Sequence, residues 1–174
     1  TIVSSSALKQ VTNPQEELAI LETQLIGDSQ VIVDIYSRYL FEKEVFERRE
    51  NSELNADELC EIMENAQKAT FGDGLDERYL QKWMWTWKPH YYFAGLSFYN
   101  FPYAFGLLFG TGLYAIYQET GASFVADYKK LLASTGEASA ADLAARFGID
   151  IRKKEFWQNS LKIISARVDR YCEI

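Results

Sequence analysis

The stretch QEELAILETQLIGDSQVIVDIYSRYLFEKEVFERRE, residues 15–50, decides the fold class of this chain. Its apolar side chains fall mostly at three- and four-residue steps, which places them on one face of an α-helix. These side chains are Leu18, Leu21, Leu25, Ile32, Ile35, Tyr39 and Phe46. Asn13 and Pro14 precede the stretch, a pair typical of an N-cap followed by a first-turn proline. Gly27 and Asp28 interrupt the stripe, and we expect a kink or a break there.

Helix signals continue to the end of the chain. Asn55 and Glu58 form a capping-box pair that opens a helix ending near Gly72. Asn100, followed by a proline, is typical of an N-cap, and its helix is expected to reach about residue 119. Further helices are predicted over about 123–134, after the capping box SAAD (139–142), and over about 154–172, where Trp157, Leu161, Ile164, Val168 and Tyr171 form an apolar stripe. No alternating β pattern occurs, so we predict a single all-α region over residues 1–174.

Composition narrows the functional classes. The chain has 25 acidic and 18 basic residues and a net charge of −7, which argues against a nucleic-acid-binding or anionic-membrane surface. Cys60 and Cys172 are isolated and form no CxxC motif, which favours a reducing, cytoplasmic setting. The start, TIVSSSALKQ, has neither Met nor the pattern of a signal peptide. We therefore expect the chain to be part of a longer parent protein.

One segment is unusually aromatic. Residues 83–109 contain 12 of the 26 aromatic residues, about three times an even share, and KPHYYFAGLSFYNFPYAFGLLFG (88–110) contains the only histidine, His90. Membrane insertion is one interpretation, because residues 89–118 carry no charge. The helical part, however, offers fewer apolar positions than the roughly 20 that a spanning helix needs. Core packing is the second interpretation, although buried tyrosine hydroxyls and an imidazole all need hydrogen-bond partners.

The third interpretation is a polar aromatic wall that faces a peptide. A tyrosine hydroxyl can donate a hydrogen bond to a carbonyl oxygen as that oxygen becomes a tetrahedral oxyanion. Tyr99 and Tyr103 are four residues apart across the first turn of a predicted helix, so they can face the same way. Gly106 and Gly110 on that helix would let another helix or a ligand approach closely.

The same residues carry a family resemblance. GDGLD (72–76), WKPHYY (87–92), SFYNFPYAFGLLFG (97–110) and FGIDI followed by FW and SL (147–161) together resemble the C-terminal part of oligoendopeptidase F, in the thimet-oligopeptidase-like family of zinc metallopeptidases. ILETQLIGDSQVIVDIYSRYLFE (20–42) is similar to a more upstream part of the same proteins. The blocks lie in the same order and cover essentially the whole chain.

The resemblance implies a zincin-like, multi-helix catalytic domain that hydrolyses short peptides. It implies that Tyr103, Tyr99 and His90 hydrogen-bond the oxyanion or the substrate backbone. It adds Tyr91, Tyr92 and Gly106 as substrate-binding residues, with Gly106 at the position where thimet oligopeptidase has a further tyrosine.

The chain departs from the family at the metal. It has one histidine and no HExxH motif, so the resemblance implies that Zn²⁺ is bound upstream, in the N-terminal part of the same peptidase. This chain alone is then expected to bind no metal and to be inactive. The alternative is a non-catalytic helical module that binds a peptide or a protein through an aromatic groove.

Overall fold

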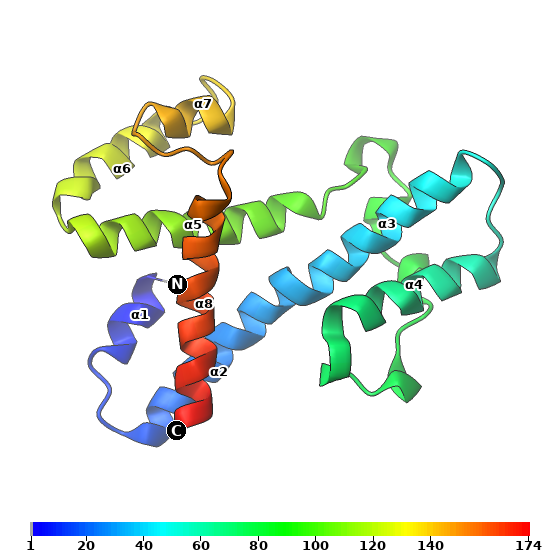
Figure 1. Cartoon of the computed structure of the whole chain (residues 1–174), viewed down its shortest axis with the longest axis horizontal. Helices are drawn as coiled ribbons and strands as arrows, with labels where there is room; N and C mark the ends of the chain where they lie inside the picture. The colour runs from blue at the N-terminus through cyan, green and yellow to red at the C-terminus, as the bar shows by residue number, and fades with distance from the viewer. Residues whose placement is uncertain (1) are drawn as a thin grey trace. The chain divides into compact units, whose positions relative to one another are not determined.

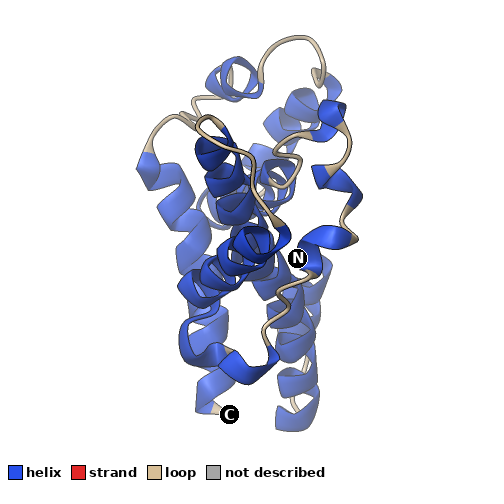
Figure 2. Ribbon diagram, turned by 90° about the vertical axis from the view of Figure 1, so that its right-hand side faces the viewer, coloured by secondary structure: helices blue, strands red, loops and turns tan. Residues whose placement is uncertain are grey.

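The computed structural model describes residues 2–174, in which every regular element is helical and none is a strand (Figures 1 and 2). The α-helices are α1 (Ile2–Leu8), α2 (Pro14–Ser29), α3 (Ile35–Arg49), α4 (Ala56–Phe71), α5 (Phe101–Thr120), α6 (Ser123–Ala133), α7 (Ala140–Ala145) and α8 (Lys154–Glu173). The all-α prediction is therefore confirmed. No helix in this described part of the chain is long and apolar enough to cross a bilayer.

The chain divides into two compact units. The central unit is Gly27–Phe105, and the terminal unit comprises the residues up to Ile26 together with Gly106–Ile174. The single region predicted from the sequence is thus helical throughout, but it has two separate cores.

The core of the central unit lies where α3 packs against α4, side by side in Figure 1. Its buried members are Phe41, Ile62, Met63 and Ala66. After α4 the chain has no further α-helix until residue 101; it runs through the short 3₁₀ turns η2 (Gly72–Gly74), η3 (Glu77–Tyr79), η4 (Met84–Thr86), η5 (Pro89–Tyr91) and η6 (Ala94–Leu96). Buried Gln67 of α4 holds this segment, because its side-chain amide exchanges two hydrogen bonds, of 2.9 and 3.2 Å, with the backbone of Gln81.

The core of the terminal unit is formed by the buried side chains Leu113, Leu131, Leu143, Ala144 and Ile149. Helices α5 and α8 approach closely at Gly112, where an added Cβ would lie 2.5 Å from the Phe156 ring. The buried Ser160 hydroxyl donates a 2.7 Å hydrogen bond to the carbonyl oxygen of Leu108 at the same contact. No atom comes within 4 Å of the Cβ position at Gly106 or Gly110, so the close helix approach that we expected there occurs at Gly112 instead.

Three of the four predicted N-caps are confirmed. Asn13 accepts from the backbone of Gln15 at 3.0 Å, Asn55 forms the full capping box with Glu58, and Ser139 accepts from the backbone of Asp142. Each satisfies backbone N–H groups that have no partner inside the helix. Asn100 is the exception. Its Nδ2 donates to the side chain of Glu42, and its Oδ1 accepts no hydrogen bond, so α5 begins without a side-chain cap.

We expected a kink or a break at Gly27 and Asp28, and no break occurs there. Residues 14–49 are helical without interruption, and the irregularity is the π-helical segment η1 (Gln30–Asp34), where the N–H of Ile35 donates to the carbonyl of Gln30. A glycine inside a helix costs only about 1 kcal/mol relative to alanine, which is too little to end a long helix. A π segment widens one helical turn and turns the side chains after it, and such segments are frequent at functional sites.

The apolar stripe of α8 is only partly buried. Ile164 is buried as the spacing suggests, but Leu161 and Val168 are more than 40% exposed. The contact face of the helix is centred on Ser160 instead, because a small side chain lets α8 approach the backbone of α5.

Candidate functional site

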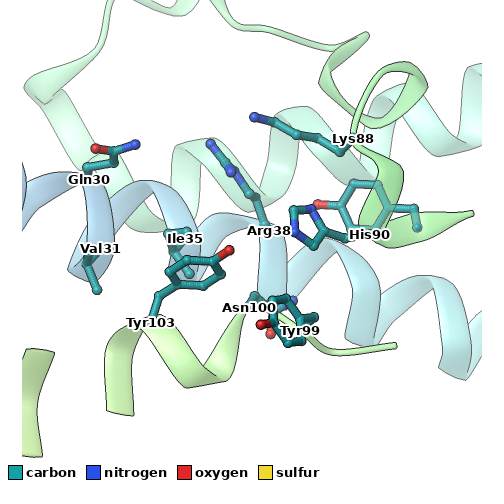
Figure 3. Close-up of a pocket in the computed structure, with 10 residues that line it drawn as sticks. Gln30, Val31, Ile35, Arg38, Lys88, His90, Tyr99, Asn100 and Tyr103 are labelled. Atoms are coloured by element: carbon teal, nitrogen blue, oxygen red, sulfur yellow. The ribbon is translucent and has the colours of Figure 1, made fainter. Parts of the chain in front are cut away.

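A cavity of about 330 Å³ lies inside the central unit (Figure 3). Segment η1, helix α3, turn η5 and the chain around the start of α5 all contribute to it. The lining residues are Gln30, Val31, Ile35, Arg38, Lys88, His90, Tyr91, Tyr99, Asn100 and Tyr103. Its volume is at the lower end of the range for ligand pockets. Four of the six predicted site residues therefore line one cavity.

Three aromatic rings form a continuous row along this cavity. The imidazole of His90 stacks on Tyr99, with 5.8 Å between ring centroids and 13° between ring planes. Tyr99 meets Tyr103 edge to face at 5.9 Å. Both tyrosines are 44% exposed, so the row presents phenol groups to an incoming molecule instead of burying them. Such a wall can donate hydrogen bonds to carbonyl oxygens without needing a counter-ion.

Glu42 of α3 accepts hydrogen bonds from the two residues on either side of Tyr99 in the sequence. Its carboxylate accepts from the backbone N–H of Phe98 at 2.6 Å and from Nδ2 of Asn100 at 2.8 Å. The side chain is buried, and burial raises the pKa of Glu42; the two hydrogen bonds, and less strongly the charge of His90, act in the opposite direction. Because the two donors flank Tyr99 in the sequence, Glu42 fixes the position of the tyrosine that stacks on His90.

Phe98 takes up an unusual backbone conformation at this point. Its φ is 56°, and it is the only residue other than glycine with a positive φ in the described part of the chain. A bulky side chain in the left-handed region costs about 1–2 kcal/mol. The cost is offset by the hydrogen bond to Glu42 and by ring packing. The centroid of the Phe98 ring lies 5.9 Å from that of Tyr39 and 5.1 Å from that of Phe46.

Tyr91 lines the cavity and also packs against the core of the central unit. Its ring packs against Phe41 with centroids 5.0 Å apart, and its hydroxyl is buried without a hydrogen-bond partner among the described residues. Burial is the main reason why the pKa of Tyr91 is raised; Arg38 lowers it, and Glu42 and Asp34 raise it further. Tyr91 therefore stays a neutral phenol, and its role in binding a substrate remains a prediction.

The other two predicted residues lie elsewhere. Tyr92 is 59% exposed and donates a 3.1 Å hydrogen bond to the carbonyl of Trp85, and it is not among the residues that line the cavity. Gly106 belongs to the terminal unit and does not line the cavity either.

The charged residues of the site were not predicted from the sequence. Arg38 lines the cavity and forms an ion pair with Asp34 one helical turn earlier, and Lys88 lines it from the start of η5. A signal for Lys88 was available, since it is the only charged residue between positions 83 and 118. Arg38 and Glu42 had no such signal, because both lie in a helix rich in charges.

Within the described residues, no group of three or more His, Cys, Asp or Glu side chains is placed to hold a metal ion. His90 is the only imidazole of the chain, it stacks on Tyr99, and the residues that line the cavity include no thiol and no carboxylate. This donor set does not fit Zn²⁺, which is bound by three or four thiolate, imidazole or carboxylate ligands. Comparison of the chain with known protein families, curated proteins and solved structures finds no match.

Proposed function

We propose that this chain is the C-terminal, substrate-facing part of a zinc-dependent oligoendopeptidase that hydrolyses short peptides. The observation that carries the proposal is the row His90–Tyr99–Tyr103, three candidate residues that line one cavity in ring-to-ring contact. The described residues supply no zinc site, so the metal ion and the activated water would come from the N-terminal part of the same peptidase. The cytoplasmic setting belongs to the same proposal.

The row would act on the scissile carbonyl. The Tyr103 hydroxyl donates a hydrogen bond to the carbonyl oxygen, and the bond strengthens as negative charge develops on that oxygen. Tyr99 restricts the Tyr103 ring by its edge contact, and His90 restricts Tyr99 by stacking. Glu42 and the left-handed Phe98 fix the backbone that carries Tyr99, so the donors are positioned before the substrate arrives.

The test is a substitution in the complete product of the gene that encodes this chain, assayed with a quenched fluorescent peptide and added zinc. Tyr103→Phe removes one oxygen and keeps the ring. Losing a single oxyanion donor should lower kcat about 10²-fold with a smaller effect on KM. Tyr79→Phe, the same change at an exposed site outside the cavity, should leave kcat unchanged. Failure of the complete product to cleave peptides would refute the proposal, and an unchanged kcat in Tyr103→Phe would refute the role of Tyr103.

A second candidate function is a peptide- or protein-binding module without catalysis. It is favoured by the aromatic rings that lie outside the cavity: Trp87, Tyr92 and Phe93 are each 59–64% exposed. Exposed aromatic side chains close together are typical of binding surfaces. Tight peptide binding by a complete gene product that never cleaves the peptide would favour this candidate.

A further inference from the structure

The cavity has a charged end that the row of aromatic rings does not explain. Figure 3 shows the guanidinium of Arg38 and the ammonium of Lys88 on the same side of the cavity, with the Tyr103 hydroxyl directed toward that side. Asp34 pairs with Arg38 but does not line the cavity. Two cations and one acid leave this end with an excess positive charge, in a protein whose net charge is −7.

Arg38 is held by its ion pair with Asp34, but no comparable contact accounts for Lys88. Lys88 lies 3.8 Å from the centroid of the Trp87 ring, but a surface cation–π contact is weak and does not require a cavity wall. Arg38 and Lys88 also repel each other. Burial is the main cause of the lowered pKa of Lys88, and the charge of Arg38 lowers it further, with Asp34 acting in the opposite direction. An anion bound between the two side chains would relieve this repulsion.

We propose that the Arg38–Lys88 end of the cavity is a carboxylate-binding subsite. A planar carboxylate accepts hydrogen bonds from a guanidinium and an ammonium together, and such charge-assisted bonds are about twice as strong as neutral ones. The cavity is large enough for one amino-acid residue beside the Tyr103 hydroxyl. That this carboxylate belongs to a peptide rests on the proposed function. The carboxylate is either the C-terminus of the peptide or an acidic side chain.

Binding to the 174-residue chain itself tests this subsite without any catalysis. Three probes share one length: acetyl-tetraalanine with a free C-terminus, the same peptide as its C-terminal amide, and an amidated peptide with one Glu in place of an Ala. Trp87 lies beneath Lys88, so tryptophan fluorescence can follow binding, with calorimetry as a second method. We expect a carboxylate-bearing probe to bind about 10-fold more tightly than the neutral amide, and added salt to reduce this preference. Which of the two acidic probes binds better identifies the source of the carboxylate.

The chain provides a matched pair of variants. Lys88→Met removes the charge and keeps an unbranched side chain over Trp87, and it should abolish the 10-fold preference. Lys82→Met is the control, because Lys82 makes the same kind of contact with Trp83, at 5.7 Å, and does not line the cavity. It should leave the preference unchanged.

Each outcome is decisive for the subsite. Equal binding of the three probes, equal effects of the two lysine variants, or no binding of any probe would overturn it. None of these results alters the hydrolysis assay of the complete gene product, so the subsite and the proposed peptidase function can fail independently.

Discussion

The two units use aromatic side chains in opposite ways. In the terminal unit, four phenylalanines pack against the buried core: Phe109, Phe124, Phe147 and Phe156. In the central unit, rings of the segment between α4 and α5 are at least half exposed: Trp83, Trp87, Tyr92 and Phe93. The backbone explains the difference. Side chains three or four residues apart share one face of a helix, whereas the short 3₁₀ turns change direction every few residues and carry successive rings to different sides. Aromatic density alone therefore does not separate a core from a site wall.

The units also differ in what holds them together. The terminal unit depends on close packing, with Gly112 of α5 directly against Phe156 of α8. The aromatic segment of the central unit depends on buried polar contacts, above all those of Glu42. Substitutions can test each dependence separately, because Trp83, Trp85 and Trp87 report on the central unit and Trp157 on the terminal unit.

The largest effect is expected at the polar contact. Glu42→Ala leaves the N–H of Phe98 and the amide of Asn100 without an acceptor, and it should lower the free energy of unfolding by about 3 kcal/mol. The matched control is Glu47→Ala on the same helix, which removes an exposed ion pair with Lys43 and should cost less than about 0.5 kcal/mol. Urea unfolding followed by tryptophan fluorescence measures both.

The same substitution has a local signature. Because His90 is the only histidine, its ring signals in an NMR spectrum are assigned without ambiguity, and the stacked Tyr99 ring shifts them. Glu42→Ala should move these signals toward random-coil positions, and Glu47→Ala should not. Unmoved signals in a folded Glu42→Ala variant would show that Glu42 does not position Tyr99.

The contribution of Glu42 to stability should depend on pH with the opposite sign to that of a carboxyl group whose pKa is lowered on folding. Its pKa in the folded protein is raised above the ordinary value of 4.5, so the folded state holds this proton more tightly than the unfolded state. The associated stability is present below pH 4.5 and is lost as pH rises through the folded pKa. Glu42→Gln mimics the neutral acid, so it should become more stable relative to the wild type as pH rises. Asp142 of the terminal unit has a lowered pKa, mainly through Ser139, and its contribution is instead lost as pH falls. If the free energy of unfolding differed between wild type and Glu42→Gln by the same amount at every pH, the raised pKa would be contradicted.

In the terminal unit the sensitive position is Gly112. A methyl group there would lie 2.5 Å from Cζ of Phe156, so Gly112→Ala must displace that ring and should cost about 2 kcal/mol. Gly110→Ala, two residues earlier on the same helix, meets nothing within 4 Å and should stabilise the protein by up to about 1 kcal/mol through helix propensity. Equal effects of the two substitutions would show that the α5–α8 contact is looser than its geometry indicates.

The fold was largely predictable because its signals are local. Capping residues and apolar periodicity act within one helical turn, so the α-helices that begin near Asn13, Asn55 and Ser139 could be placed from the sequence. Helix pairing could not be predicted. The burial of Ser160 in place of Leu161 depends on the shape of α5, which lies far away in the sequence.

The candidate site was predictable where its members are sequence neighbours and unpredictable where they are not. His90, Tyr99 and Tyr103 lie in one conspicuous segment. Arg38 and Glu42 reach that segment from α3, more than 45 residues earlier. Asn100 shows the same limit, since its N-cap pattern is overridden by the hydrogen bond to Glu42.

The smallest predicted effect concerns asparagine at two positions of α4, the N-cap and the helix interior. Asn55→Ala removes the side chain that accepts from the backbone of Asp57 and Glu58 at the start of α4, and it should lower the free energy of unfolding by about 1 kcal/mol. Asn65→Ala makes the same chemical change at an exposed position inside the same helix, where alanine is the better helix former, so it should raise stability by up to about 0.7 kcal/mol. Urea unfolding of both variants measures the difference. Opposite signs would establish that position relative to the helix end, and not residue type, determines the contribution of asparagine in α4; two losses of equal size would mean that the capping box adds nothing to the central unit.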